Sequence, residues 1–147
     1  MQLAPDPGNS CFGCGGANTR GMQLTFEQDD VAQRIRGRFR LSEDYQGGSG
    51  YIHGGIIATL LDEVMSKANR FRNATAVTAE LNVEYLKPVR VGDEVIVEGW
   101  ETGAEGRNLF LQGEIRNGEG VVLARGRGRF VDLKAKRDPH AQEVPAK

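Results

Sequence analysis

The sequence predicts an α+β domain in which an antiparallel sheet curls around one long, buried helix. Three observations predict this fold. The 147 residues, 39% of them hydrophobic, suit one compact domain with one core. One segment, from Gly54 to about Asn69, has helical periodicity and an unusually wide apolar surface. Two strand patterns precede this segment and four follow it.

Composition and charge exclude several classes of protein. Nineteen Lys and Arg residues against 20 Asp and Glu residues leave a net charge of −1, which argues against a nucleic acid or membrane partner. No basic and apolar leader opens the sequence, and its longest apolar stretch, near 56–61, is far too short to span a bilayer. We therefore expect a cytoplasmic protein. The 20 glycines, about twice the usual ~7%, are expected at turns and close backbone contacts.

The two ends of the chain differ from its middle. Residues 1–20 are expected to form a loop, because proline, glycine and asparagine interrupt every periodic pattern there. Residues 134–147 contain two prolines, several charges and almost no apolar side chains, which indicates a flexible tail. The folded domain is therefore expected within residues 21–133.

Alternation of apolar and polar residues indicates the strands. The first is expected at 22–26 and the second at 31–41, joined into a hairpin by an Asp-Asp turn. An Asn-Gly pair at 117–118 predicts a second tight turn. Four consecutive strands are expected after the helix, at about 76–86, 94–102, 107–117 and 120–132.

The segment His53-Gly54-Gly55 leads directly into the helix. In the first turn, the amides of Gly54, Gly55 and Ile56 have no partners within the helix, and the positive end of the helix dipole lies there. These donors are suited to hold a developing oxyanion, although a glycine-rich helix start without a function is the alternative. His53 is a candidate acid or base, but we favour a role in which it orients the turn. With no second histidine nearby, we expect no metal site.

Two adjacent carboxylates lie in the middle of the helix. Glu63 is followed four residues later by Lys67, so it is expected to face solvent in a surface ion pair. Asp62 has no cation three or four residues away. It is either a catalytic group, or it faces water at an interface or caps a neighbouring loop. Gly55 and Asp62 lie roughly 10 Å apart along a helix, so acting on one carbonyl group would require a two-fold dimer.

These motifs resemble the PaaI-like acyl-CoA thioesterases of the hotdog-fold superfamily. Residues 50–63 read GYIHGGIIATLLDE, with the aspartate nine residues after the histidine. The similarity continues through 77–89 and 92–93, and an N-terminal element begins with CFGCG at 11–15. It covers about residues 11–131.

The resemblance implies a long helix wrapped by an antiparallel sheet, in a homodimer or a dimer of dimers with the active site between subunits. The substrate would be an acyl-CoA thioester, hydrolysed without a metal or organic cofactor. By the same resemblance, the Gly55 amide polarises the carbonyl, Asp62 acts as general base or nucleophile, and Thr78 positions water or the intermediate. The alternatives are a non-catalytic acyl-CoA binding or regulatory protein of this fold and, ranked third, a hydratase.

Two positions leave questions open. Strand alternation places Thr78 on the same side as Glu80, and a catalytic role and an ordinary strand position are equally open for it. Many relatives carry an asparagine six residues before the histidine, where this chain has Gly47. Gln46 and Ser49 are the candidates to replace this asparagine in substrate binding. At the helix start, Gly54 is a further candidate for substrate binding.

Alternate positions of the last strand hold Arg125, Arg127 and Arg129, so all three are expected to point to one face. By the resemblance, Arg127 and Arg129 are candidates for binding coenzyme A phosphates, with Arg90 from a loop. A solvated face on which they pair with Glu114 or other strand carboxylates is equally open. Aromatic residues are not interleaved with these arginines, which argues against RNA.

Cys11 and Cys14 form one CxxC motif. Two cysteines do not make an extracellular disulfide framework. A zinc knuckle needs a second ligand pair, which only two chains together would supply, and a redox pair is the other alternative. We expect a structural loop that packs near the site, without a metal.

Overall fold

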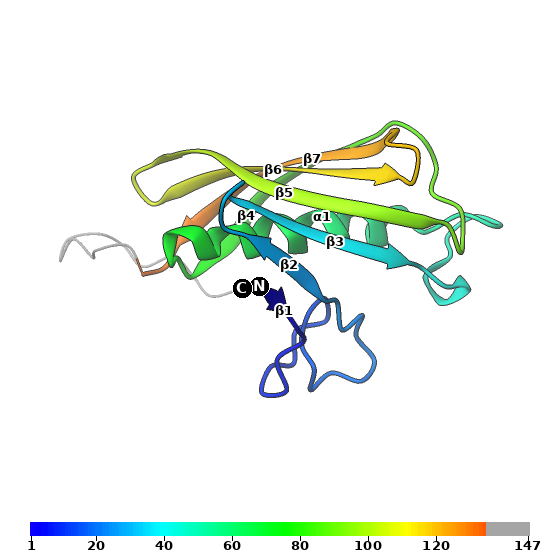
Figure 1. Cartoon of the computed structure of the whole chain (residues 1–147), viewed down its shortest axis with the longest axis horizontal. Coiled ribbons are helices and arrows are strands. Elements are labelled where there is room, and N and C mark those ends of the chain that lie inside the picture. Colours follow the sequence, from blue (N-terminus) through cyan, green and yellow to red (C-terminus); the bar gives the residue numbers. More distant parts are fainter. Residues whose placement is uncertain (135–147) are drawn as a thin grey trace.

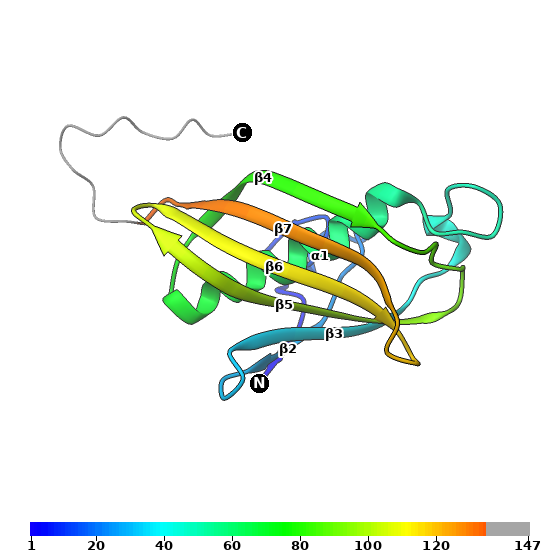
Figure 2. The same ribbon diagram turned by 90° about the horizontal axis from the view of Figure 1, so that it is seen from above.

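The computed structural model describes residues 1–134, so the expected tail lies, except for Lys134, outside the described residues. One helix, α1 (Gly54–Ala68), lies against an antiparallel sheet of seven strands in the order β1-β2-β3-β5-β6-β7-β4. The strands are β1 (Gln2–Leu3), β2 (Phe26–Asp29), β3 (Arg34–Arg40), β4 (Ala76–Tyr85), β5 (Glu94–Glu105), β6 (Asn108–Asn117) and β7 (Val122–Asp132). Two short 3₁₀ helices span Glu43–Tyr45 and Asn69–Arg72. Figure 2 shows the strands from β2 to β4 in this order, with α1 behind them.

Helix α1 forms because its apolar side chains recur every three to four residues and meet the sheet. Leu60, Leu61, Val64 and Met65 are completely buried, and the helix contacts β5, β6 and β7. Figure 1 shows α1 running along one face of the sheet. The prediction of one enclosed helix within an α+β domain is confirmed. Within residues 1–134, no helix has the length and apolar character needed to cross a membrane.

Glycines on the inner face of the sheet allow the helix to approach closely. A Cβ at Gly99 in β5 would lie 2.7 Å from the carbonyl oxygen of Val64, which is too close for any side chain. At Gly113 in β6 and Gly126 in β7, a Cβ would lie 3.3 and 3.2 Å from side chains of α1. Part of the glycine excess therefore serves the contact between helix and sheet.

The N-terminal hairpin begins later in the sequence than predicted. A strand was expected at 22–26, but β2 begins only at Phe26. The preceding residues are held by the N-terminal loop, because the amides of Met22 and Leu24 donate to loop carbonyl oxygens at 2.7 and 2.9 Å. The expected loop at 1–20 also contains β1, which pairs with β2.

Candidate active site

Helix α1 and strand β4 bring Asp62 and Thr78 together. Thr78 Oγ1 donates a hydrogen bond to Asp62 Oδ1 at 2.7 Å. Both side chains are half-buried. Hydrogen bonds to an ionised carboxylate are roughly twice as strong as those between neutral groups, so this contact fixes the orientation of the carboxylate.

A β-bulge in β4 turns Thr78 towards the helix. The register with β7 shifts so that Thr78 lies opposite Phe130 and Glu80 lies opposite Arg129. Directly opposed residues point to the same face. Phe130 is completely buried, whereas Arg129 binds Glu80 on the outer face. The prediction that Thr78 shares a face with Glu80 is therefore wrong, because the extra residue, Ala79, reverses the alternation.

The start of α1 presents one backbone amide without a hydrogen bond. His53 is the N-cap residue, and its Nδ1 accepts a hydrogen bond from the Gly55 N–H at 2.8 Å. The Ile56 N–H donates to the His53 carbonyl oxygen at 2.9 Å. Of the three predicted donors, only the Gly54 N–H has no acceptor within residues 1–134. The ring and the carbonyl oxygen of His53 thus engage two of the three amides that were expected to hold an oxyanion, and within the described residues only the Gly54 amide stays open.

The imidazole of His53 acts as a structural cap in this geometry. Because Nδ1 accepts the hydrogen bond, the neutral ring carries its proton on Nε2. The side chain is exposed, and the His53 amide donates to the Tyr45 carbonyl oxygen at 2.8 Å. His53 thus fixes the turn from both its backbone and its ring.

Sequence reasoning missed Tyr85, which ties β4 to the helix start. Its hydroxyl donates to the Gly54 carbonyl oxygen at 2.7 Å. Simple alternation places Tyr85 and Thr78, seven residues apart, on opposite faces. Only the bulge at Ala79 brings both to the helix side. We see no local sequence signal that would have identified this bulge.

The loop before the helix leaves no room for a side chain at position 47. A Cβ on Gly47 would lie 2.9 Å from the Cα of His53. A larger side chain there, such as the asparagine that the resemblance leads one to expect, would have to move the turn. Gln46 Oε1 accepts a hydrogen bond from the Gly50 N–H at 3.3 Å, which holds the loop, and Ser49 is exposed.

The Glu63 side chain points to the N-terminal loop. Cys11 Sγ lies 3.6 Å from Glu63 Oε1, and Cys14 belongs to the same cluster. The expected solvent-facing position of Glu63 is wrong, because this loop packs on its side chain. Burial and the Glu63 carboxylate raise the pKa of the Cys14 thiol to about 12, so this thiol is not a nucleophile at neutral pH. The Lys67 side chain acts in the opposite direction on Cys14 and lowers the pKa of its thiol.

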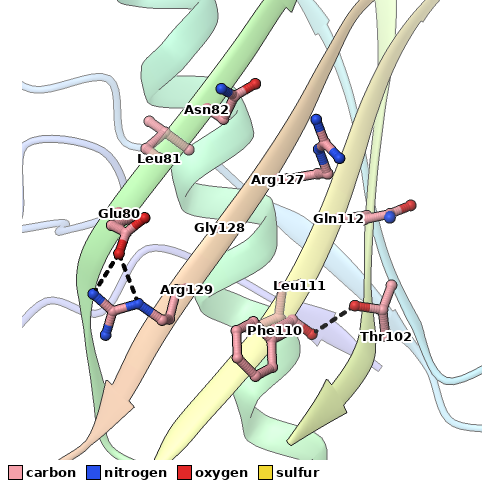
Figure 3. A pocket seen from close by; sticks show the side chains of 10 residues that line it. All are labelled: Glu80, Leu81, Asn82, Thr102, Phe110, Leu111, Gln112, Arg127, Gly128 and Arg129. Atoms are coloured by element: carbon pink, nitrogen blue, oxygen red, sulfur yellow. Dashed lines mark hydrogen bonds and ion pairs between the residues drawn. The ribbon is translucent and has the colours of Figure 1, made fainter.

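Arg125, Arg127 and Arg129 form the arginine row of β7. Arg127 and Arg129 border a depression on the outer face of the sheet, away from α1 (Figure 3). Arg129 pairs with Glu80 at 2.6 Å, and Arg125 lies 3.7 Å from Glu114. Arg127 has no ion pair or hydrogen bond within the described chain. The depression has a volume of about 870 Å³, but the candidate catalytic carboxylate lies on the helix side of the sheet. The structure therefore does not bring the arginine row to that carboxylate.

Arg90 lies beside the segment that leads into α1. It forms an isolated β-bridge with Tyr51 and is exposed. No ion pair of Arg90 occurs among residues 1–134. A cavity of about 270 Å³ at this end of the molecule is bordered by Gly54, Tyr85 and mostly apolar neighbours. A cation and a small apolar cavity thus adjoin the helix start.

Strand β4 is an open edge of the sheet. It pairs with β7 on one side only. Four large apolar side chains on or directly after β4 are exposed, namely Val77, Leu81, Tyr85 and Leu86. An exposed apolar edge strand favours pairing with another chain.

Comparisons with known proteins agree with this architecture. A family model described as Thioesterase superfamily matches residues 49–124, a range that includes the helix start, Asp62 and Thr78. Acyl-coenzyme A thioesterase THEM4 from Rattus norvegicus is 31% identical over 103 residues, which are 70% of this chain and 44% of that protein. The chain therefore spans less than half the length of this relative.

Solved structures share the fold. The crystal structure of one thioesterase superfamily protein superposes with a TM-score of 0.78 at 30% identity, over 84% of this chain and 60% of that chain. The E. coli PaaI protein from the phenylacetic acid degradation operon gives a TM-score of 0.66 at 18% identity, over 70% and 75% of the two chains. The predicted hotdog fold is confirmed. With the family model matching more than half of its residues, the chain belongs to the thioesterase superfamily.

Proposed function

We propose that this protein is an acyl-CoA thioesterase, which hydrolyses a thioester to a free carboxylic acid and coenzyme A. The observation that carries this proposal is the hydrogen bond that holds the Asp62 carboxylate on Thr78, in a chain of the thioesterase superfamily. The relative from Rattus norvegicus is named an acyl-coenzyme A thioesterase. A protein of the same fold from Streptococcus mutans was solved bound to acetyl CoA.

Asp62 is the proposed general base or nucleophile. As a base, it removes a proton from the water that attacks the thioester carbonyl carbon. As a nucleophile, it attacks that carbon itself and expels the coenzyme A thiolate, and water then hydrolyses the resulting acyl-enzyme anhydride. Thr78 lies 16 residues after Asp62. Two solved variants of a hypothetical thioesterase from Streptococcus pneumoniae replace a threonine and an aspartate with the same spacing by alanine.

The Gly54 amide is the proposed donor to the developing oxyanion. It is the open N–H at the positive end of the helix dipole, where negative charge is stabilised. Gly55, which the resemblance assigned to this role, donates to His53 instead. In this proposal Gly55 and His53 form the turn that presents the Gly54 amide.

The site is proposed to lie between two subunits. Gly54 and Asp62 are eight residues apart, roughly 12 Å along a helix, which is too far for both to act on one carbonyl group. A two-fold dimer would place the Gly54 amide of one subunit opposite Asp62 and Thr78 of the other. The exposed apolar edge of β4, the strand that holds Thr78, supports this strand as the dimer contact. A further pairing into a dimer of dimers remains part of the proposal.

Coenzyme A phosphates are proposed to bind Arg90 and Arg127. Both guanidinium groups are exposed, and neither has an acidic partner in the described chain. Arg129 is a weaker candidate, because Glu80 already neutralises it. At the helix start, Gln46 remains a candidate for positioning the substrate, although its side-chain oxygen is engaged by the loop.

The function is tested with a panel of aliphatic and aromatic acyl-CoA thioesters. Hydrolysis of each substrate is measured as release of the coenzyme A thiol. The wild-type protein should hydrolyse at least one substrate, and Asp62→Ala should lose turnover while keeping its circular dichroism spectrum. Asp30→Ala, in the exposed turn between β2 and β3, is the matched control and should hydrolyse normally. Unchanged hydrolysis by Asp62→Ala would refute the proposed role.

A second candidate function is non-catalytic binding of acyl-CoA. The packing of Gly47 against His53 favours it, because this packing excludes the asparagine side chain that the resemblance implies at that position. Tight binding of acyl-CoA by the wild-type protein without hydrolysis of any substrate in the panel would establish this function in place of the first.

A further inference from the structure

The N-terminal loop and α1 bring three metal-binding side chains together. The Sγ atoms of Cys11 and Cys14 and a carboxylate oxygen of Glu63 all lie within 4.8 Å of one another. The three side chains are half-buried. Cys11 and Glu63 are 52 residues apart in the sequence, so the fold creates the cluster. The proposed thioesterase site uses none of these side chains.

Backbone contacts hold the loop in this arrangement. A Cβ on Gly13, between the cysteines, would lie 2.4 Å from the Glu63 Cδ. A side chain at this position would therefore displace the Glu63 carboxylate from its place beside the thiols. The Gly15 N–H donates to the Cys11 carbonyl oxygen at 2.9 Å, and the Cys11 N–H donates to Asn9 Oδ1 at 2.7 Å. The turn that carries both thiols is thus closed by its own hydrogen bonds.

The spacing of the ligand atoms suits a tetrahedral zinc ion. Zn–S bonds of about 2.3 Å and Zn–O bonds of about 2.1 Å, at tetrahedral angles, separate the ligand atoms by roughly 3.6–3.8 Å. Cys11 Sγ is already 3.6 Å from Glu63 Oε1. Two thiolates select a borderline-soft cation such as Zn²⁺ over Mg²⁺ or Ca²⁺, which prefer oxygen ligands.

The charges around the cluster also suit a divalent cation. Two thiolates and one carboxylate carry three negative charges, of which Zn²⁺ neutralises two. Lys67, which lies one helical turn after Glu63 and acts on the Cys14 thiol, supplies the remaining positive charge. A complete site would therefore be neutral and half-buried, without an uncompensated charge.

We propose that Cys11, Cys14 and Glu63 bind one Zn²⁺ ion, with a water molecule as the fourth ligand, and that the ion fixes the N-terminal loop to α1. Binding releases the two thiol protons to solvent. Glu63 follows Asp62 directly but projects about 100° further round the helix, so the ion stays apart from the catalytic carboxylate. The expectation of no metal overlooked this third ligand, because Glu63 was expected to face solvent.

Elemental analysis and titration of the metal-free full-length protein with Co²⁺ test the proposal. We expect one zinc per chain after purification, and a thiolate-to-cobalt charge-transfer absorption that saturates at one equivalent and is displaced by Zn²⁺ but not by Mg²⁺. Cys11→Ser combined with Cys14→Ser should abolish both signals. Glu63→Gln keeps both thiols and should weaken Zn²⁺ binding by about tenfold or more.

Ser10→Ala is the matched control, because this exposed side chain precedes the CxxC motif without belonging to the cluster. Zn²⁺ should raise the melting temperature of the wild-type protein and of Ser10→Ala, but not that of the double cysteine variant. Three results would overturn the proposal: no zinc in the wild-type protein, equal Zn²⁺ affinity in Glu63→Gln, or a Cys11–Cys14 disulfide in reducing buffer. If the double variant fails to fold, Glu63→Gln still decides the outcome.

Discussion

Replacing Gly54 by proline removes the proposed oxyanion donor and little else. Gly54 is the first residue of α1 after the N-cap, and this position favours proline because its N–H has no partner in the helix. His53 has φ −58° and ψ 135°, a conformation compatible with a following proline. A Cβ at Gly54 would lie 3.5 Å from Tyr85 Oη, an ordinary contact. Gly54→Pro is therefore expected to fold.

The expected loss of turnover follows from the role of a single backbone donor. Removal of one donor from an oxyanion site costs about 10²–10³ in kcat, or roughly 2.7–4 kcal/mol. The assay measures kcat and KM with the best acyl-CoA substrate from the panel. Because the hydrogen bond is proposed to strengthen in the transition state, kcat should fall by this factor while KM changes little.

Gly54→Ala is the matched control, because it adds a methyl group but keeps the N–H. It should retain activity within about threefold, since its Cβ meets only ordinary contacts. Equal activity of Gly54→Pro and the wild-type protein would refute the assignment of this amide. Equal losses of kcat in Gly54→Pro and Gly54→Ala would show that the added side-chain atoms at the helix start, and not the missing N–H, cause the effect.

Three other predictions concern the hydrogen bond to Asp62, the helix–sheet contact and pH. Thr78→Ala should lower kcat about 10- to 100-fold, because it removes a hydrogen bond to a charged group. Thr78→Ser keeps the hydroxyl and should retain most of the activity. Equal kcat values for Thr78→Ala and the wild-type protein would contradict this role. Gly99→Ala should displace α1 and destabilise the protein by about 1–3 kcal/mol, which lowers the melting temperature. Gly103 has open space around it, so Gly103→Ala should not lower the melting temperature. Equal melting temperatures of the two variants would contradict this prediction. Burial disfavours the charged form of Glu98, but hydrogen bonds from two arginines of β3 outweigh burial and hold its pKa below the ordinary 4.5. This carboxylate therefore stabilises the fold above about pH 4.5 and loses that contribution as pH falls through its lowered pKa. In denaturant titrations, the free energy of unfolding of Glu98→Gln should fall less steeply with acidification than that of the wild-type protein. Parallel pH profiles of the two proteins would contradict this.

Periodicity in the sequence predicted the helix and most of the strands. The recurrence of apolar residues located α1 to within one residue, because a spacing of three to four residues places them on one face that is buried against the sheet. The helical spacing also drew attention to Asp62, because no cation lies three or four residues away to neutralise this carboxylate.

Contacts between distant segments could not be read from local patterns. The direction of Thr78 depends on one extra residue in β4, and a bulge leaves the local alternation of residue types unchanged. Glu63 has a cation at the favourable helical spacing, yet the N-terminal loop packs on its side chain. Local patterns also could not show that the His53 ring accepts the Gly55 N–H, because a side-chain cap depends on the rotamer of His53.

A mixed-subunit measurement tests whether the active site is shared between two chains. Asp62→Ala and Gly54→Pro subunits, each inactive alone, are mixed and allowed to exchange. If the two groups act across the dimer, each mixed dimer contains one intact site, and random pairing should restore about a quarter of wild-type activity. If the mixture is no more active than the separate variants although mixed dimers form, Asp62 and Gly54 do not act together across the interface.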